Sequence, residues 1–260
     1  MLACDIFPGK TNGDDVLIFY HGGGAHRRAG YQHFAAGLAQ AGDISVCLPD
    51  IRGHGGSEGP RGHTPSPACA WSDIDAVIAE MRRKFPRGRI YLGGHSSGVG
   101  YVLNAFARLA HRREIAELIF LAPEFGFRAD TRRAGADFAR VRVWAFIINA
   151  MSGGHVAGAL PAVFFPSRAA GPGAGLLSFY TVNMANAVTP QNPGAQLKAI
   201  NMPVRIFYAG NDELIDPEKL KKFVAAHAPP ACSMAAVPSS HLEIMLDAGP
   251  AVAKALASRR

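Results

Sequence analysis

The sequence predicts an α/β protein with a mostly parallel, doubly wound sheet and an inserted, mainly helical lid. Short apolar runs alternate with amphipathic segments, a pattern typical of βαβ units whose sheet is covered on both faces by helices. The alternation stops after residue 122 and resumes after residue 200. A long interruption of this kind favours a lid over the carboxyl edge of the sheet. We therefore expect a core of residues 1–122 and 201–260 and a lid of residues 123–200.

The individual elements follow from the spacing of apolar residues. Continuous apolar runs predict strands, and apolar positions three or four residues apart predict helices. The expected strands are residues 2–7, 16–20, 44–48, 90–92, 117–122, 204–209 and 233–237. The expected helices are residues 31–40, 69–85, 99–110, 217–226 and 248–257. Between residues 123 and 200 the chain is rich in aromatic and small residues and shows no clean strand–helix pair.

The composition is that of a globular protein with 48% hydrophobic and 18% charged residues. No apolar stretch approaches the roughly 20 residues that cross a bilayer, so we expect no stable membrane insertion and at most transient surface contact. The net charge of +7 forms no basic stripe interleaved with aromatics, which argues against nucleic-acid binding. The four cysteines lie far apart and lack Cys-x-x-Cys spacing, which predicts reduced thiols in a cytoplasmic protein. The oligomeric state is left open.

The strongest local motif is Gly-x-Ser-x-Gly at residues 94–98, between an expected strand and an expected helix. A serine in a tight strand-to-helix turn is held at the end of the sheet, and the helix start directs free N–H groups at an anion beside it. This pattern predicts a nucleophile elbow with Ser96 at its tip. His95 lies within the motif and is expected to pack around the site. Because glycine is abundant in this chain, the motif alone is weak evidence.

Three other loops follow separate strands and are expected at the same edge of the sheet. His21-Gly22-Gly23-Gly24 follows the strand at 16–20, Asp212 follows the strand at 204–209, and His241 follows the strand at 233–237. The order serine, aspartate, histidine is the one expected when a catalytic triad is built on an α/β-hydrolase sheet. His241 would take the proton of Ser96, and Asp212 would fix the imidazole tautomer. The N–H groups of Gly23 and Ser97 are candidates for an oxyanion hole.

Each of these residues also has a plainer interpretation. Asp212 could be a turn aspartate, with Glu213 or Asp216 as the acid, although Asp216-Pro217 is typical of a helix N-cap followed by proline. The glycine loop could bind phosphate or merely turn the chain. His21, His26 and His54 lie on adjacent loops without a carboxylate or cysteine at ligand-like spacing, so no metal site and no cofactor are expected.

With these motifs in place, the chain resembles the α/β-hydrolase superfamily, in its monoacylglycerol lipase, lysophospholipase and serine aminopeptidase-like branch. The matching stretches are residues 21–26, 50–59 and 94–98, together with the positions of Asp212 and His241. The resemblance implies that Ser96 is the nucleophile, Asp212 the acid and His241 the base, with oxyanion donors at Gly23 and Ser97. It also implies that the loop at 50–59 shapes the site without performing chemistry. His21, Gly22, Gly24 and His95, from their positions beside Gly23 and Ser96, are expected to shape the site as well.

The lid is expected to decide the substrate. Between residues 125 and 211 the only acidic residues are Asp130 and Asp137, whereas an aminopeptidase of this architecture is expected to hold the substrate ammonium with carboxylates. An aromatic lid suits an apolar acyl group. We therefore expect a serine hydrolase of monoacylglycerol-like, lysophospholipid-like or short acyl esters. A thioesterase, lactonase or acyltransferase with the same triad, and a non-catalytic ligand-binding protein, remain alternatives. Epoxide hydrolase and dehalogenase chemistry is disfavoured because those enzymes have aspartate in place of Ser96.

Overall fold

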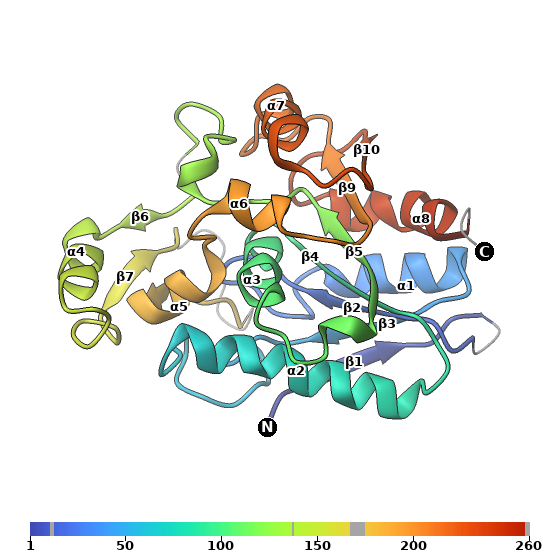
Figure 1. Cartoon of the computed structure of the whole chain (residues 1–260), viewed down its shortest axis with the longest axis horizontal. Coiled ribbons are helices and arrows are strands. Elements are labelled where there is room, and N and C mark those ends of the chain that lie inside the picture. Colours follow the sequence, from blue (N-terminus) through green and yellow to red (C-terminus); the bar gives the residue numbers. More distant parts are fainter. Residues whose placement is uncertain (11–12, 137, 167–174, 258–260) are drawn as a thin grey trace.

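The computed structural model describes residues 1–10, 13–136, 138–166 and 175–257 (Figure 1). Its centre is a seven-stranded sheet with the strand order β1-β3-β2-β4-β5-β9-β10. β1 is antiparallel to β3, and the other neighbouring pairs are parallel. The bounds of the seven strands are Cys4–Phe7 (β1), Val16–Tyr20 (β2), Ser45–Pro49 (β3), Ile90–His95 (β4), Ile115–Leu121 (β5), Val204–Ala209 (β9) and Cys232–Val237 (β10). The prediction of a mostly parallel α/β sheet is confirmed.

The register of the middle strands brings the loops after β2, β4 and β5 together. β4 lies between β2 and β5, and Gly94 pairs with Tyr20 on one side and Phe120 on the other. These strands are buried along almost their whole length, as expected for a sheet covered on both faces. Ser96, immediately after β4, therefore lies at the carboxyl edge of the sheet near its middle.

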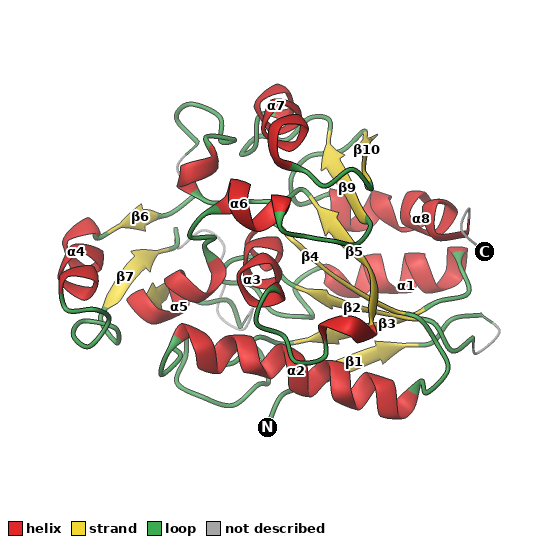
Figure 2. Cartoon of the chain, in the orientation of Figure 1, coloured by secondary structure: helices red, strands yellow, loops and turns green. Residues whose placement is uncertain are grey.

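Helices cover both faces of this sheet, as Figure 2 shows. On one face α1 (Tyr31–Ala41) packs against α8 (Ile244–Ala257), and their apolar side chains form one core cluster with β2, β3 and β5. On the other face lie α2 (Pro67–Lys84), α3 (Ser97–Phe106) and α7 (Pro217–His227), which contribute to a second cluster. Each of these helices overlaps a predicted one, although α3 begins two residues earlier than expected and ends four residues earlier.

The segment between β5 and β9 forms a smaller unit at the side of the sheet. In Figure 1 α4, β6 and β7 lie to the left, away from β1 and β10. Its described residues contain an antiparallel three-stranded sheet, β6-β7-β8, that the sequence did not predict, together with short helices. Its elements are η2 (Phe127–Ala129), β6 (Arg140–Val141), α4 (Val143–Met151), β7 (Pro161–Phe164), β8 (Phe179–Thr181), α5 (Val182–Val188) and α6 (Pro193–Lys198).

The cysteines depart from the prediction of reduced thiols. Cys4 in β1 and Cys47 in β3 form a disulfide, while Cys69 and Cys232 are free. The antiparallel pairing of β1 with β3 places Ile6 opposite Cys47 and brings the two cysteine Cα atoms to 6.5 Å, within disulfide range. Because the pair is 43 residues apart in the sequence, its spacing gave no sign of this contact. The cytoplasmic location stays a prediction.

Candidate active site

Ser96 occupies a sharp turn between β4 and α3. Its backbone has φ 53° and ψ −124°, a conformation that residues with a side chain rarely adopt. The turn leaves no space beside it: a Cβ on Gly94 would lie 2.7 Å from the carbonyl carbon of Gly98, and a Cβ on Gly98 would lie 2.5 Å from the carbonyl oxygen of His21. Glycine at both positions therefore permits the turn, and the turn presents Ser96 to a cavity at the edge of the sheet.

Ser96, His241 and Asp212 form a continuous hydrogen-bonded chain. The Oγ of Ser96 is 2.9 Å from Nε2 of His241, and Nδ1 of His241 is 2.8 Å from Oδ2 of Asp212. His241 and Asp212 are buried. The carboxylate can only accept, so Nδ1 carries a proton and Nε2 is the acceptor for the serine hydroxyl. The structure thus brings together the three residues that the sequence analysis expected to meet.

Asp212 is held as an anion by its surroundings. Burial alone would raise the pKa of its carboxyl, but the hydrogen bond and charge of His241 and the N–H groups of Ile215 and Leu214 together lower that pKa below its ordinary value. The two N–H groups bind Oδ1 at 2.8 and 2.9 Å, which leaves Oδ2 for the imidazole.

The two alternative acids have other partners. Oε2 of Glu213 accepts the backbone N–H of His241 at 2.9 Å, so this side chain holds the histidine loop and not the imidazole. Asp216 caps helix α7 by accepting the N–H groups of Glu218 and Lys219. Of the three candidates, Asp212 is the one in hydrogen-bond contact with the His241 ring.

The proposed oxyanion donors lie side by side next to Ser96. A Cβ on Gly23 would be 3.2 Å from Oγ of Ser97, and both residues line the same cavity as Ser96. Within the described part of the chain, the N–H groups of Gly23 and Ser97 have no hydrogen-bond partner. Ser97 is the first residue of α3, where the helix dipole favours negative charge. Two free N–H groups beside a serine hydroxyl are suited to hold an oxyanion.

Two buried histidines fix the loops around this site. His95 donates from Nε2 to the carbonyl of His241 at 2.9 Å, and Nε2 of His21 accepts the N–H of Ile51 at 3.1 Å. Burial lowers the pKa of His95 to about 3 and that of His21 to about 4, so both rings are neutral at physiological pH. Both nitrogens of His21 are engaged, since Nδ1 also contacts the carbonyl of Gly22.

Sequence reasoning missed two tyrosines at the glycine loop. The hydroxyl of Tyr31 in α1 accepts the N–H of Gly22, and the hydroxyl of Tyr180 in β8 accepts the N–H of Gly24, each at 2.7 Å. No spacing in the sequence links these residues, because the bonds span 9 and 156 positions. The two glycine N–H groups on either side of Gly23 are therefore occupied.

The cavity beside Ser96 has a volume of about 620 Å³ and is mostly apolar. Gly23, Ser97 and His241 line it together with Ser96, and most of its other lining residues come from the segment between β5 and β9. Among the described lining residues the one carboxylate is Glu124, which is bonded to the guanidinium of Arg132 at 2.7 Å and to the N–H of Gly126. The apolar part of the wall includes Phe127, Phe138, Val141, Val143, Phe146, Val163, Phe165, Val188 and Leu214.

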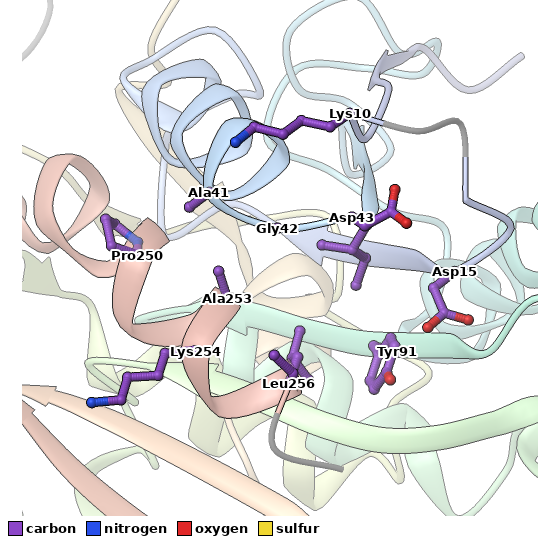
Figure 3. Close-up of a pocket in the computed structure, with 12 residues that line it drawn as sticks. Lys10, Asp15, Ala41, Gly42, Asp43, Tyr91, Pro250, Ala253, Lys254 and Leu256 are labelled. Carbon is purple, nitrogen blue, oxygen red and sulfur yellow. The ribbon is translucent and has the colours of Figure 1, made fainter. Parts of the chain in front are cut away.

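A second cavity of about 530 Å³ lies at the opposite end of the strands (Figure 3). It is bordered by Asp15 before β2, Tyr91 at the start of β4 and Lys254 in α8. Its described lining contains no serine, cysteine or histidine, so it offers none of the nucleophiles found at the first cavity.

Comparisons with known proteins agree with this geometry. The family model "Serine aminopeptidase, S33" matches residues 11–156, more than half of the chain. The fold is similar to a monoacylglycerol lipase from Paleococcus ferrophilus, with 19% identity, TM-score 0.69, and coverage of 100% of this chain and 98% of the other. It is also similar to a soluble variant of monoglyceride lipase from Saccharomyces cerevisiae, with 14% identity, TM-score 0.70 and coverage of 99% and 90%.

A third similar structure is Est1E from Butyrivibrio proteoclasticus with ferulic acid bound, at 18% identity, TM-score 0.67 and coverage of 99% and 94%. Identities this low establish the fold and leave the substrate open. The chain has the α/β-hydrolase fold, and it belongs to the serine aminopeptidase S33 family of serine hydrolases.

Proposed function

We propose that this protein hydrolyses carboxylic esters of apolar acyl groups through an acyl-enzyme on Ser96. The observation that carries the proposal is the hydrogen-bonded chain from Ser96 through His241 to Asp212, which opens directly into an apolar cavity. Serine alone is a weak nucleophile at neutral pH, and a neutral imidazole within hydrogen-bond distance supplies the base that it needs.

In the first half of the reaction, Oγ of Ser96 attacks the ester carbonyl carbon while its proton passes to Nε2 of His241. The resulting imidazolium is stabilised by Asp212, and the negative carbonyl oxygen is held by the N–H groups of Gly23 and Ser97. Collapse of this intermediate breaks the bond to the alcohol oxygen, which takes the proton from His241. Water then attacks the acyl-enzyme in the same way and releases the carboxylic acid.

The cavity favours an apolar acyl or alcohol group over a free amino terminus. Glu124 is already paired with Arg132, and Arg128 also lines the cavity, so the described lining offers no uncommitted carboxylate for an ammonium group. Of the two acidic residues considered in the sequence, Asp130 is paired with Lys219 at 3.0 Å, and Asp137 lies outside the described residues. The similar folds of two monoacylglycerol lipases support an ester substrate.

Residues 123–200 act, in this proposal, as a cap that forms the substrate-binding wall. Support comes from the cavity itself, since Phe138, Phe146, Val163 and Tyr180 from this segment face the same space as Ser96 and His241. The core would then supply the chemistry and the cap would select the acyl group.

The cap also supports transient contact with an anionic lipid surface. Helix α4 exposes Val143, Trp144, Ile147, Ile148 and Met151, with Arg140 and Arg142 immediately before it. Residues 138–211 contain no aspartate or glutamate, so no carboxylate within this segment would repel such a surface. Within the described residues, no helix is long and apolar enough to cross a membrane. Co-sedimentation with lipid vesicles tests this contact.

The decisive test compares the wild type with Ser96→Ala on p-nitrophenyl esters of graded acyl length. We expect turnover to fall by about 10⁴-fold or more, with circular dichroism unchanged, because the nucleophile is lost. Labelling by a fluorophosphonate probe should disappear in the same variant. Equal turnover in the two proteins contradicts the proposal, and a wild type that binds ligands without labelling favours the non-catalytic alternative. Thioester, lactone and acyl-transfer donors in the same panel separate the remaining chemistries.

A further inference from the structure

Gly23 lies between two similar chains of hydrogen bonds. Each chain, here called a relay, runs from a glycine N–H through a tyrosine hydroxyl to a histidine ring. On one side the N–H of Gly22 donates to the hydroxyl of Tyr31, which lies 2.9 Å from Nδ1 of His95. On the other side the N–H of Gly24 donates to the hydroxyl of Tyr180, which lies 2.7 Å from Nε2 of His54. Each relay occupies the N–H of one glycine next to Gly23, and the N–H of Gly23 has no partner among the described residues.

The direction of each relay is set by a backbone carbonyl. Nδ1 of His54 is 2.9 Å from the carbonyl of Arg52, and Nε2 of His95 is 2.9 Å from the carbonyl of His241. A carbonyl only accepts, so these nitrogens carry the protons and the opposite ring nitrogens accept from the tyrosines. Burial lowers the pKa of His54 well below its ordinary value, which keeps the ring neutral and the acceptor available.

The two relays come from different parts of the chain. Tyr31 belongs to helix α1 of the core, whereas Tyr180 belongs to β8 of the inserted segment. The inserted segment holds the same loop at two further points. The N–H of Leu177 donates to the carbonyl of Gly24 at 2.8 Å, and a Cβ on Gly24 would lie 3.0 Å from the ring of Phe165. The oxyanion loop is therefore clamped by the core on one side and by the inserted segment on the other.

We infer that Tyr180 is a positioning residue that sets the oxyanion donor at Gly23, and that the inserted segment thereby controls the chemical step as well as substrate binding. The inference rests on the proposed function, because it assumes that Gly23 donates to an oxyanion. Tyr180 does not touch the reacting atoms in this scheme. It acts by holding the N–H of Gly24 and hence the peptide of Gly23 next to it.

The test is Tyr180→Phe, which keeps the ring and removes the hydroxyl. Loss of the bond to Gly24 frees the loop, and displacement of a catalytic group by about 1 Å costs on the order of 100-fold in rate. We expect kcat on p-nitrophenyl esters to fall by about 10- to 100-fold, with KM within about threefold of the wild type. Tyr101→Phe is the matched control, since its buried hydroxyl donates to the carbonyl of Ala70 away from the cavity lining. It should leave kcat unchanged.

A second readout separates positioning from simple packing. A trifluoromethyl ketone with an apolar chain forms an oxyanion on Ser96, whereas the corresponding alcohol does not. In Tyr180→Phe the inhibition constant of the ketone should rise in parallel with the loss of kcat/KM, and that of the alcohol should not change. Equal weakening of both ligands would show that Tyr180 only lines the cavity, and a kcat within about twofold of the wild type would also overturn the inference.

His54→Asn tests the relay without changing the tyrosine. The asparagine amide can still donate to the carbonyl of Arg52, but the side chain is too short to place its own acceptor oxygen where Nε2 of His54 accepts the hydroxyl of Tyr180. We expect a smaller fall in kcat, and a double variant no worse than Tyr180→Phe alone, because the two side chains act as one unit. Fully additive losses would contradict the relay.

If instead the wild type neither turns over esters nor reacts with fluorophosphonate, the proposed function has failed, independently of these variants.

Discussion

The seven-stranded core and the segment inserted between β5 and β9 differ in which side chains they bury. The core buries polar groups, and the inserted segment exposes apolar ones. In the core, His241 and Asp212 are buried, and each hydrogen bond of the chain that starts at Ser96 has a defined donor and acceptor. In the inserted segment, apolar side chains reach the surface, with Trp144 half exposed and Met151 84% exposed. The core is organised for chemistry, and the inserted segment presents apolar surface both to the cavity and to the outside.

Because of this difference, the core residues indicate the type of reaction, whereas the residues of the inserted segment indicate little about the substrate. A triad needs three residue types at three strand ends, and these requirements are the same for any ester. An apolar wall accepts many side chains and many acyl groups, so its residues say little about one substrate. The Tyr180 relay is the exception, since it ties a residue of the inserted segment to the geometry of the core.

The largest predicted effect belongs to the core. Asp212→Asn places an amide donor against Nδ1 of His241, which forces the proton onto Nε2 and removes the acceptor for Ser96. We expect kcat to fall by about 10³- to 10⁴-fold for every acyl length, as measured by steady-state kinetics on the ester panel. Asp216→Asn makes the same chemical change four positions away. It should be nearly silent, because asparagine also caps helices well. A similar loss in both variants would sink the assignment of Asp212.

The core is also the region whose fold could be predicted from the sequence. The expected strands 16–20 and 204–209 match β2 and β9 residue for residue, because β2 is a continuous apolar run and Arg205 alone interrupts the run of β9. β4 runs three residues further than expected, to His95, since Gly93 and Gly94 break its apolar pattern. The strands of the inserted sheet are only two to four residues long and carry no usable periodicity. Cys4 and Cys47 are joined by a pairing that no local pattern reveals.

The residues of the candidate site also fall into two groups, those that the sequence predicts and those that it does not. Ser96, Asp212 and His241 were predictable because each follows its own strand, and parallel strands bring such positions to one edge. Tyr31 and Tyr180 were not, because a tyrosine on a helix or short strand is usually a packing residue and its hydroxyl partner depends on tertiary contacts. The order of the motifs along the chain thus predicts the candidate catalytic groups, while their hydrogen-bond partners emerge only from the folded structure.

A smaller effect is expected at the surface of the inserted segment. In the double variant Trp144→Ser with Ile147→Ser, two exposed apolar side chains of α4 are lost. Since burying one such side chain contributes about 1.5–3 kcal/mol, binding to anionic phosphatidylglycerol vesicles should weaken by about tenfold or more. Turnover of a soluble acetyl ester should not change. Leu246→Ser, at an equally exposed leucine of α8, should bind vesicles as the wild type does. Unaltered vesicle binding in the double variant would exclude this surface.

The smallest predicted effect is on the free energy of unfolding, and it arises from two buried histidines of the core. The buried rings of His95 and His21 have pKa values lowered by burial from 6.5 to about 3 and about 4. Below pH 6.5 the unfolded chain therefore binds protons that the folded protein excludes, so the free energy of unfolding falls as the pH drops from about 6.5 towards these values. Each ring contributes a slope of up to about 1.4 kcal/mol per pH unit, about tenfold in the unfolding constant.

Urea unfolding between pH 7 and pH 5 measures this slope before most carboxylates titrate. His95→Gln removes one of the buried rings, so its slope should be shallower than that of the wild type by up to about 1.4 kcal/mol per pH unit. His33→Gln, at an exposed position of α1, should keep the full slope because its ring meets water in both states. If the wild type and His95→Gln lose stability in parallel on acidification, His95 takes up a proton in the folded protein. It could then no longer accept from Tyr31 through Nδ1, and the core half of the clamp on Gly23 would be wrong.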